Sequence, residues 1–225
     1  LLDLGKITGY SWVSAGLYLA LIVALYGLYG FGYRLVAWGR GTVRLSVVML
    51  FGAALCLELV WVYPATAADV FGYVAHGRLL ALHQVNPFVV APGEFPADPI
   101  VPFLAFANEP SPYGPAWVLL NGGLAQIARG NLLVEVLLYK SVAALAHLAG
   151  AGVVFAIARR LCGDTQRARA SAYLYAWNPM VLWEMVGNAH NDGVMMLMGL
   201  AAAWLFVVRR DLLVLPALVV GALIK

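Results

Sequence analysis

The sequence has few charged residues and almost no cysteine. Only 11% of its 225 residues are Asp, Glu, Lys or Arg, whereas 63% are hydrophobic, and the mean hydropathy is +0.85. Soluble domains carry roughly 25% charged residues, so this composition excludes an ordinary soluble protein. The apolar residues also form continuous runs, not the spaced stripes of amphipathic helices. The chain is therefore predicted to be an integral membrane protein.

The two cysteines, Cys56 and Cys162, are predicted to be free thiols. Cys56 lies within an apolar run and Cys162 among basic residues, so we expect them at different depths, too far apart for a disulfide. The net charge of +3 does not indicate a nucleic-acid partner. The basic residues stand beside the apolar runs and therefore mark membrane topology.

Six apolar runs are long enough, or nearly so, to cross a bilayer as helices. A membrane-spanning helix needs about 20 mostly apolar residues, because the hydrocarbon core is about 30 Å thick. The predicted spans are residues 12–38, 45–63, 132–157, 170–186, 193–208 and 212–225. Together they predict an all-α fold, a polytopic transmembrane helical bundle in one transmembrane domain. We expect a truncated fragment, because the sequence starts without Met and ends within an apolar run.

Basic residues give the bundle a predicted orientation, because Lys and Arg concentrate in short cytoplasmic loops. Three basic clusters follow predicted spans: Arg34, Arg40 and Arg44; Arg159, Arg160, Arg167 and Arg169; Arg209 and Arg210. If all three are cytoplasmic, residues 64–131 and 187–192 lie on the extracytoplasmic face. The bias toward Ala, Leu, Val and Arg indicates a bacterial source, and hence an inner-membrane location.

Residues 64–131 are predicted to form a long extracytoplasmic loop with short interfacial helices. Its apolar stretch 115–127 is too short to cross and is interpreted as a re-entrant or interfacial helix. Asn86 and Pro87, then Pro112 and Gly114, are predicted to form turns that shape the entry into this helix.

Asp69 admits two compatible interpretations. Thr66 can cap a helix that starts there, and Asp69 would then complement the helix dipole. In that helix Asp69, Tyr73 and His76 share one face at positions i, i+4 and i+7, which favours a catalytic carboxylate just outside the bilayer. A carboxylate near a helix start can still face a cavity.

Polar residues also interrupt the predicted span 170–186. Pro179 should break the helix, and Asn178 can bond backbone groups that the break frees. Glu184 follows within two turns. Deeper in the membrane, Glu58 and Lys140 each lie roughly 10 Å below the outer surface at 1.5 Å per residue. Intramembrane charges are usually paired or functional, so we expect these two to pair as a structural lock.

The tip at residues 187–192 carries His190, Asn191 and Asp192 on the same side as Asp69. A plain loop would explain these residues as well as a site would. His190, Asp192 and Asp69 are metal-ligand types, but their spacing matches no metal motif. The sequence therefore predicts no metal and no cofactor.

Several short motifs, in this order, resemble the GT-C superfamily of polytopic glycosyltransferases, and especially bacterial mannosyltransferases that use polyprenyl-phosphate-mannose. The motifs are Asp69-Val-Phe-Gly-Tyr73, Gly77, Asn86-Pro87, Ser111-Pro-Tyr-Gly-Pro115, Trp177-Asn-Pro179, Glu184, His190-Asn-Asp192 and Ala222-Leu-Ile-Lys225. The resemblance implies a catalytic aspartate at Asp69 and a sugar donor carried on a lipid phosphate. The chain departs from the family pattern in having an extra span before residue 44.

The predicted chemistry is transfer of a hexose, with mannose favoured, from a polyprenyl-phosphate donor to a glycan or glycolipid acceptor. Asp69 would act as general base on the acceptor hydroxyl, with inversion at the anomeric carbon. The residues expected around the donor phosphate and sugar are Lys225, His190, Arg78, Tyr73, Tyr113, Asn191 and Asp192. A secondary transporter and a non-catalytic membrane scaffold remain the alternatives, and within the enzyme class the sugar could be arabinose or glucose.

Overall fold

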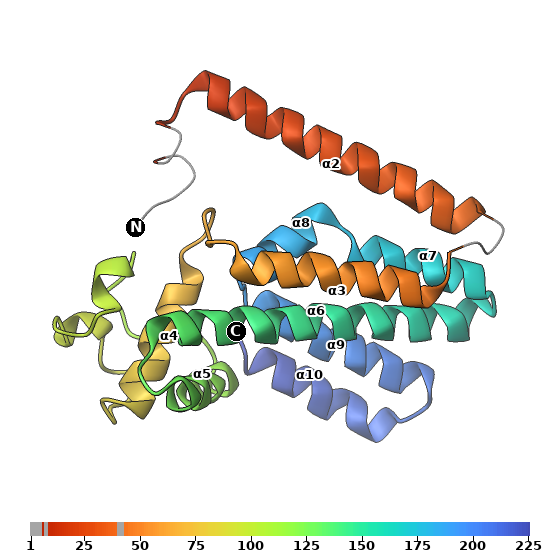
Figure 1. Cartoon of the computed structure of the whole chain (residues 1–225). Helices are drawn as coiled ribbons and strands as arrows, with labels where there is room; N and C mark the ends of the chain where they lie inside the picture. The colour runs from red at the N-terminus through yellow and green to blue at the C-terminus, as the bar shows by residue number, and fades with distance from the viewer. Residues whose placement is uncertain (1–5, 7–8, 40–42) are drawn as a thin grey trace.

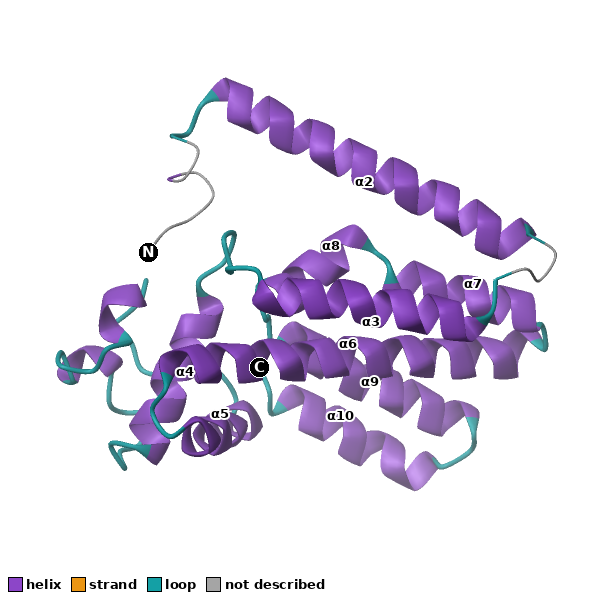
Figure 2. Cartoon of the chain, viewed as in Figure 1, coloured by secondary structure: helices purple, strands orange, loops and turns teal. Residues whose placement is uncertain are grey.

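The computed structural model describes Lys6, residues 9–39 and residues 43–225, and in these residues every regular element is a helix (Figure 1, Figure 2). The long elements are α2 (Trp12–Trp38), α3 (Leu45–Trp61), α4 (Asp69–Ala81), α5 (Pro115–Ala128), α6 (Leu132–Cys162), α7 (Thr165–Ala176), α9 (Asp192–Val207) and α10 (Val214–Ala222). The short ones are α8 (Pro179–Val181), the π-helix η3 (Leu182–Gly187) and the 3₁₀ turns η1 (Pro92–Glu94), η2 (Val101–Phe103) and η4 (Asp211–Leu213). The predicted all-α fold is confirmed.

Helices α3, α6, α7, α9 and α10 form a bundle around the long α6, while α4, α5 and the loop between them gather at one end (Figure 1). Helix α2 stands apart and touches the bundle mainly through α7. There the Tyr29 hydroxyl donates to the Leu174 carbonyl at 2.6 Å, and the Tyr29 and Tyr173 rings stack 5.5 Å apart. The predicted thiols Cys56 and Cys162 are both free.

Two described helices, α2 and α6, are long and apolar enough to cross a membrane. A third crossing is counted if α8–η3 and α9, which meet at 116°, form one broken span. Helix α3 and the η4–α10 segment are shorter apolar helices. Six spans therefore remain a prediction, and the two longest predicted runs, 12–38 and 132–157, coincide with the two long helices.

The basic turns lie together in the fold. The end of α2, the start of α3 and the α6–α7 and α9–η4 connections are all at the end of the bundle opposite α4 and α5 (Figure 1). Arg34 and Arg44 stand at the end of α2 and the start of α3, and Arg159 and Arg209 stand at the two connections. Arg40, the remaining member of the first cluster, lies outside the described residues. The arrangement separates a basic end from a loop-rich end.

The helix break predicted at Pro179 is confirmed. Helix α7 ends at Ala176, and the Asn178 side chain accepts from the Met180 and Val181 amides at 3.1 and 3.2 Å. The asparagine therefore satisfies two of the amides that a new helix start leaves free. The predicted span 170–186 is thus built from most of α7, from α8 and from the π-helix η3, because proline cannot continue the hydrogen-bond ladder.

Helix α10 ends against the start of α5. The Gly114 amide donates to the Ile224 carbonyl at 3.2 Å, and the Ala116 amide to the Leu223 carbonyl at 2.9 Å. A side-chain Cβ at Gly114 would collide with the Leu223 carbonyl. Gly114, which the sequence predicts in a turn, lies at the contact between α10 and α5. Glycine is required there because the two backbones touch and leave no room for a side chain.

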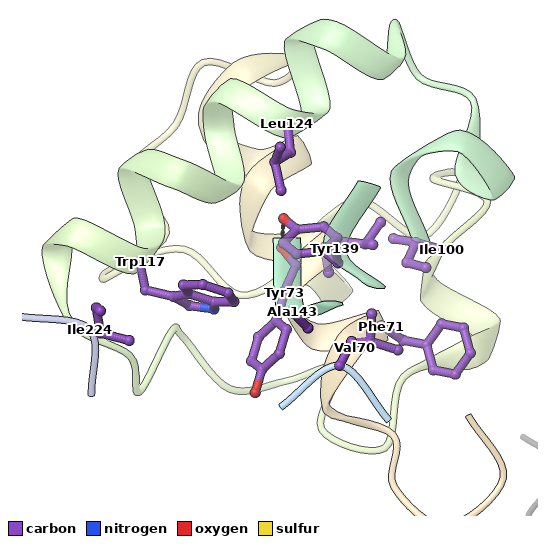
Figure 3. Packing of buried hydrophobic residues seen from close by; sticks show 12 residues of the cluster. Val70, Phe71, Tyr73, Ile100, Trp117, Leu124, Tyr139, Ala143 and Ile224 are labelled. Carbon is purple, nitrogen blue, oxygen red and sulfur yellow. Dashed lines mark hydrogen bonds between the residues drawn. The ribbon is translucent and has the colours of Figure 1, made fainter. Parts of the chain in front are cut away.

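Tyr73 lies at the centre of the packed region between α4, α5 and α6 (Figure 3). Its ring makes edge contacts with Tyr113 at 4.9 Å and Trp117 at 5.1 Å, and its backbone carbonyl accepts from the Tyr139 hydroxyl at 3.0 Å. Tyr73 is only 1% exposed. It therefore packs beside the site, and its role in binding the donor stays a prediction.

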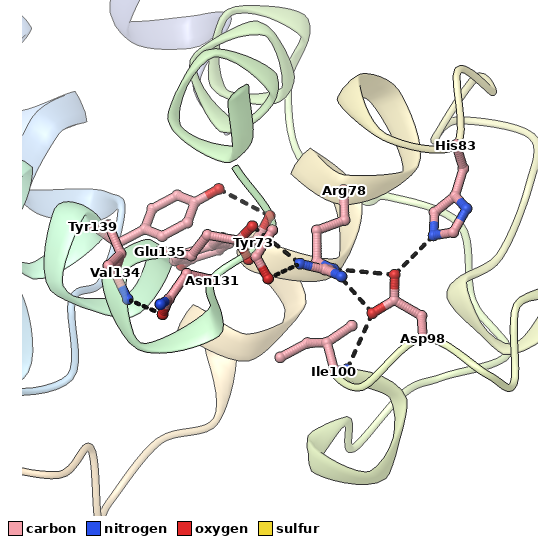
Figure 4. Close-up of polar contacts among 10 residues, drawn as sticks. Tyr73, Arg78, His83, Asp98, Ile100, Asn131, Val134, Glu135 and Tyr139 are labelled. Atoms are coloured by element: carbon pink, nitrogen blue, oxygen red, sulfur yellow. Dashed lines mark hydrogen bonds and ion pairs between the residues drawn. The ribbon is translucent and has the colours of Figure 1, made fainter. Parts of the chain in front are cut away.

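Arg78 holds the long loop to the bundle (Figure 4). Its Nε donates to both Asp98 oxygens at 2.9 and 3.0 Å, and its Nη1 donates to Glu135 Oε1 at 3.1 Å. Burial would raise the pKa of the Asp98 carboxyl, but hydrogen bonds from His83, the Ile100 amide and Arg78 outweigh it and hold that pKa below its usual value. Arg78 is thus part of a buried ion network, and its binding of the donor phosphate stays a prediction.

Glu58 and Lys140 do not form the predicted lock. Lys140 is buried and its Nζ donates to the Val62 carbonyl at the end of α3, whereas Glu58 is exposed on the surface of α3. Counting residues along each helix placed both side chains at the same depth in the membrane. The rotation of α3 about its axis nevertheless turns Glu58 away from α6. Lys140 instead binds a carbonyl left free where α3 stops.

The ion network yields a stability prediction. Arg78→Met leaves Glu135 buried without its cation, and removal of one member of a buried ion pair typically costs about 3–5 kcal/mol. We expect a matching loss in the free energy of unfolding of the full-length protein in detergent, measured by thermal or denaturant unfolding. Arg160→Met, at an exposed position, is the control and should change stability by less than about 0.5 kcal/mol. Normal stability of Arg78→Met would contradict the structural role.

Candidate active site

Asp69 is the first residue of α4, and Thr66 does not cap that helix. The N-cap residue is Ala68, without a side-chain hydrogen bond, so the predicted cap is wrong. The Thr66 hydroxyl accepts instead from Trp183 Nε1 at 2.8 Å and Asn188 Nδ2 at 2.6 Å. Thr66 thereby ties the start of α4 to the π-helix and the tip, contacts that only the fold creates.

The two oxygens of Asp69 face different partners. Oδ1 accepts from the Tyr113 hydroxyl at 3.1 Å, and Oδ2 lies 3.5 Å from His190 Nε2. Burial, and then the Asp69 carboxylate, raise the pKa of Tyr113 to about 12, so its hydroxyl stays protonated and donates at neutral pH. The Asp69 side chain is 42% exposed, which leaves the carboxylate accessible to a reacting group.

In the tip, residues 187–192, the two side chains that flank Ala189 contact different partners. Ala189 has φ +57°, a left-handed conformation that is uncommon for a residue with a side chain. On one side of it Asn188 points to Thr66, and on the other His190 points to Asp69. Backbone strain of this kind persists only where the surroundings fix it, and here the Asn188–Thr66 hydrogen bond and the approach of His190 to Asp69 hold the two sides of the tip.

Glu184 stands behind His190 on the π-helix η3. Its Oε2 accepts from Asn188 Nδ2 at 3.1 Å and lies 4.0 Å from His190 Nε2. The same imidazole nitrogen therefore faces two carboxylates, Glu184 and Asp69. Single-turn π-helices are frequent at functional sites because the extra residue re-aims a side chain, and nothing in the sequence signals this one.

Asn191 joins three elements and is 1% exposed. Its Oδ1 accepts from the Tyr73 hydroxyl at 3.3 Å, and its Nδ2 donates to the Ile224 carbonyl at 3.4 Å. The tip, α4 and the end of α10 are thus linked by one amide. Asn191 therefore holds the tip in place, and its predicted contact with a donor stays a prediction.

Lys225 and Asp192 are brought together, as the predicted site requires. Lys225 Nζ donates to Asp192 Oδ1 at 2.6 Å, with the two side chains 49% and 25% exposed. Asp192 begins α9 and Lys225 follows α10. The pair is accessible on the same side of the fold as His190, because Asn191 ties the tip to the α10 end.

The predicted turn residues of the loop serve as turn residues. Asn86 Oδ1 accepts from the Phe88 amide at 3.0 Å, and the Pro87 carbonyl accepts from the Ser111 amide at 2.7 Å. This second bond draws residues 86–87 beside 111–114 and so positions Pro112 and Tyr113 near Asp69. Asn86 and Pro87 thus lie outside the site, whereas Pro112 lines the cavity beside Asp69.

A cavity of about 200 Å³ opens on the loop side of Asp69. Its floor is the face of α4 that carries Asp69, Gly72 and His76, and its roof includes Glu109 and Tyr113. Asp69 and His76, which were predicted to share a face of α4 with Tyr73, both line this cavity. Tyr73 instead points into the core. Glu109 was not predicted, because nothing in its local sequence distinguishes it from a loop residue.

Within the part of the chain that the structure describes, no group of three or more His, Cys, Asp or Glu side chains has an arrangement suited to a metal ion. The polar groups around Asp69 are instead two carboxylates facing one imidazole, a tyrosine hydroxyl, and a lysine paired with an aspartate. Such a set can accept a proton and stabilise an anion.

Comparison with known proteins agrees with this chemistry. Residues 4–225 match the family model described as alpha-(1->6)-mannopyranosyltransferase, N-terminal domain. The chain is 27% identical over 191 residues to alpha-(1->6)-mannopyranosyltransferase B of Corynebacterium glutamicum. The aligned region covers 75% of this chain and 31% of that protein. It is 28% identical over 209 residues to alpha-(1->6)-mannopyranosyltransferase A of Mycobacterium tuberculosis, covering 86% and 38% respectively.

The chain spans about a third of the length of these two curated relatives. No solved structure matches it with significance. The family match nevertheless extends over nearly the whole chain, and it includes every element that contributes to the Asp69 site. This chain therefore belongs to the alpha-(1->6)-mannopyranosyltransferase family.

Proposed function

We propose that the protein transfers mannose from a polyprenyl-phosphate-linked donor to a glycan or glycolipid acceptor at the extracytoplasmic face of the membrane. One observation carries the proposal: the Asp69 carboxylate is partly exposed between a cavity on one side and the His190 imidazole on the other. Glycosyl transfer needs a base that lies between the acceptor and the groups that stabilise the leaving phosphate. The position of Asp69 matches this arrangement.

The sidedness of the site supports a lipid-borne donor. The basic turns lie at the end of the bundle opposite α4, and short basic loops favour the cytoplasm. Asp69 then faces outside, where nucleotide sugars are not supplied. A sugar attached to a membrane lipid phosphate reaches the site through the bilayer, so membrane lipid surrounds the protein and also delivers its substrate.

The transfer step follows from the partners of Asp69. Its carboxylate takes the proton of the acceptor hydroxyl as the acceptor oxygen forms a bond to the anomeric carbon. The bond from that carbon to the phosphate oxygen breaks, and its electron pair leaves with the lipid phosphate. A single displacement of this kind inverts the anomeric configuration. Tyr113, by donating to Oδ1, orients the carboxylate toward the acceptor.

The leaving phosphate needs positive charge as it departs. His190 and Lys225 are the candidates, since both stand beside carboxylates on the same side of the fold. Lys225 Nζ donates to Asp192, and Glu184 flanks His190. Exchange of the carboxylate partner for the phosphate would bring Lys225 or His190 to the leaving group.

The relatives' names favour mannose over arabinose or glucose, and they name an alpha-(1->6) bond. The acceptor nucleophile is then a primary hydroxyl at position 6 of a sugar. Family membership also favours an enzyme over the transporter and the scaffold that the sequence left open.

Asp69→Asn tests the base. Loss of the proton acceptor should lower mannose transfer by the full-length protein about 100-fold or more, the usual contribution of general base catalysis. Transfer from radiolabelled polyprenyl-phosphate-mannose to a mannoside acceptor in membranes is the measurement. Asp211→Asn, an exposed aspartate at the basic end of the bundle, is the matched control. Equal transfer by Asp69→Asn and wild type would remove Asp69 from the mechanism.

His190→Gln and Lys225→Met test stabilisation of the leaving phosphate. Loss of one such group should lower kcat by about 100-fold, with little change in the KM for the acceptor. Lys225→Arg keeps the charge and should restore most of the activity lost in Lys225→Met. Unchanged kcat in both His190→Gln and Lys225→Met would show that other groups carry this role.

Chelation tests the prediction that no metal takes part. A single lipid phosphate leaves, and a lysine with a histidine can offset its charge, so we expect transfer in EDTA to stay within twofold of the untreated value. Loss of transfer in EDTA that a divalent cation restores would contradict the prediction.

A further inference from the structure

The cavity on the loop side of Asp69 has features that the transfer mechanism does not use. It is lined by α4 below and by residues 104–113 of the loop above. His76 lines it and is only 5% exposed, yet neither ring nitrogen makes a hydrogen bond of normal geometry. A buried polar group without a partner costs about 1–3 kcal/mol, so this one calls for a ligand that supplies the partner.

We propose that this cavity is the subsite for the acceptor sugar, with His76 and Glu109 as hydrogen-bonding residues for its hydroxyl groups. The inference rests on the proposed function, and it adds where the acceptor binds and which residues select it. The cavity shares Asp69 with the catalytic site, so a sugar bound there brings a hydroxyl to the base from the side opposite His190.

The volume and lining of the cavity fit one sugar ring. Its volume of about 200 Å³ is below the roughly 300–1,000 Å³ of drug-sized ligand sites, which suits a single pyranose. Phe106 and Tyr113 are aromatic walls against which the apolar face of a sugar can pack. Glu109 is an exposed carboxylate at the rim and accepts hydrogen bonds from hydroxyls.

The protonation of His76 suits a sugar as well. Burial lowers its pKa to about 4, against a smaller opposing effect of the Glu109 carbonyl. At neutral pH the ring is uncharged, with one nitrogen that donates and one that accepts. The donor nitrogen is directed to the Glu109 carbonyl, and a sugar hydroxyl can donate to the other nitrogen, whereas an anion without a proton to donate cannot.

Gly72 gives the proposal a sharp test. It lies between Asp69 and His76 on the cavity floor, and a Cβ there would meet no atom within 4 Å. Gly72→Leu should therefore fill the cavity while favouring the helix, because leucine has the higher helix propensity. Gly123→Leu is the matched control: Gly123 is an exposed glycine of α5 with equally open surroundings and lies outside the cavity.

The experiment measures acceptor binding without donor, so it does not depend on catalysis. Binding of radiolabelled α-(1→6)-mannobiose to the full-length protein in detergent is compared among wild type, Gly72→Leu, Glu109→Gln and His76→Phe. Glu94→Gln, another exposed loop glutamate that does not line the cavity, is the control for Glu109→Gln. We expect Kd to rise at least fivefold in the three cavity variants and to stay within twofold in Gly123→Leu and Glu94→Gln.

Mannobiose binding that is absent in the wild type, or equal in wild type, Gly72→Leu and Glu109→Gln, would overturn the subsite. Glu109 is exposed and Gly72→Leu favours its helix, so these two variants decide the matter even if His76→Phe folds poorly. The proposed function is tested separately by mannose transfer. Wild-type transfer together with unchanged binding in the cavity variants would reject the subsite alone. Weakened binding in the variants without wild-type transfer would reject the proposed reaction alone.

Discussion

The site depends on one constraint: backbone groups released where apolar helices stop must find partners inside the protein, since a bilayer interior offers no water. Helix α10 stops at the start of α5, where amides of Gly114 and Ala116 bind its last carbonyls. The Asn191 side chain binds the same helix end. The groups that satisfy helix ends thereby fix the positions of Tyr113, His190 and Lys225 around Asp69.

The same constraint explains why so few polar residues suffice. Asn178 binds the amides at the start of α8, and Lys140 binds the carbonyl of Val62 beyond α3. These two side chains bind backbone groups, whereas Asp69, Glu184, His190 and Lys225 are partly accessible. Partly exposed carboxylates beside an imidazole and a lysine are expensive to hold near a membrane, which is the reason that such groups mark function there.

The loop is held by charge as well as by backbone bonds. Arg78 binds Asp98 of the loop and Glu135 of α6 at once, and His83 adds a bond of 2.7 Å to Asp98. This network anchors the segment that carries Glu109 and Tyr113 over α4. The loop that covers the cavity is thus tied to α4 and α6 through Arg78.

Apolar run length, proline chemistry and helical period are local properties, so the sequence predicts a membrane protein, a helical fold, the helix break at Pro179 and the shared face of Asp69 and His76. It does not predict the partners of Thr66 and Arg78, the burial of Tyr73 and Asn191, or the separation of Glu58 from Lys140. These features depend on tertiary contacts. Helix rotation and loop path set which groups meet, and both depend on contacts between residues far apart in the chain, such as Arg78 with Glu135.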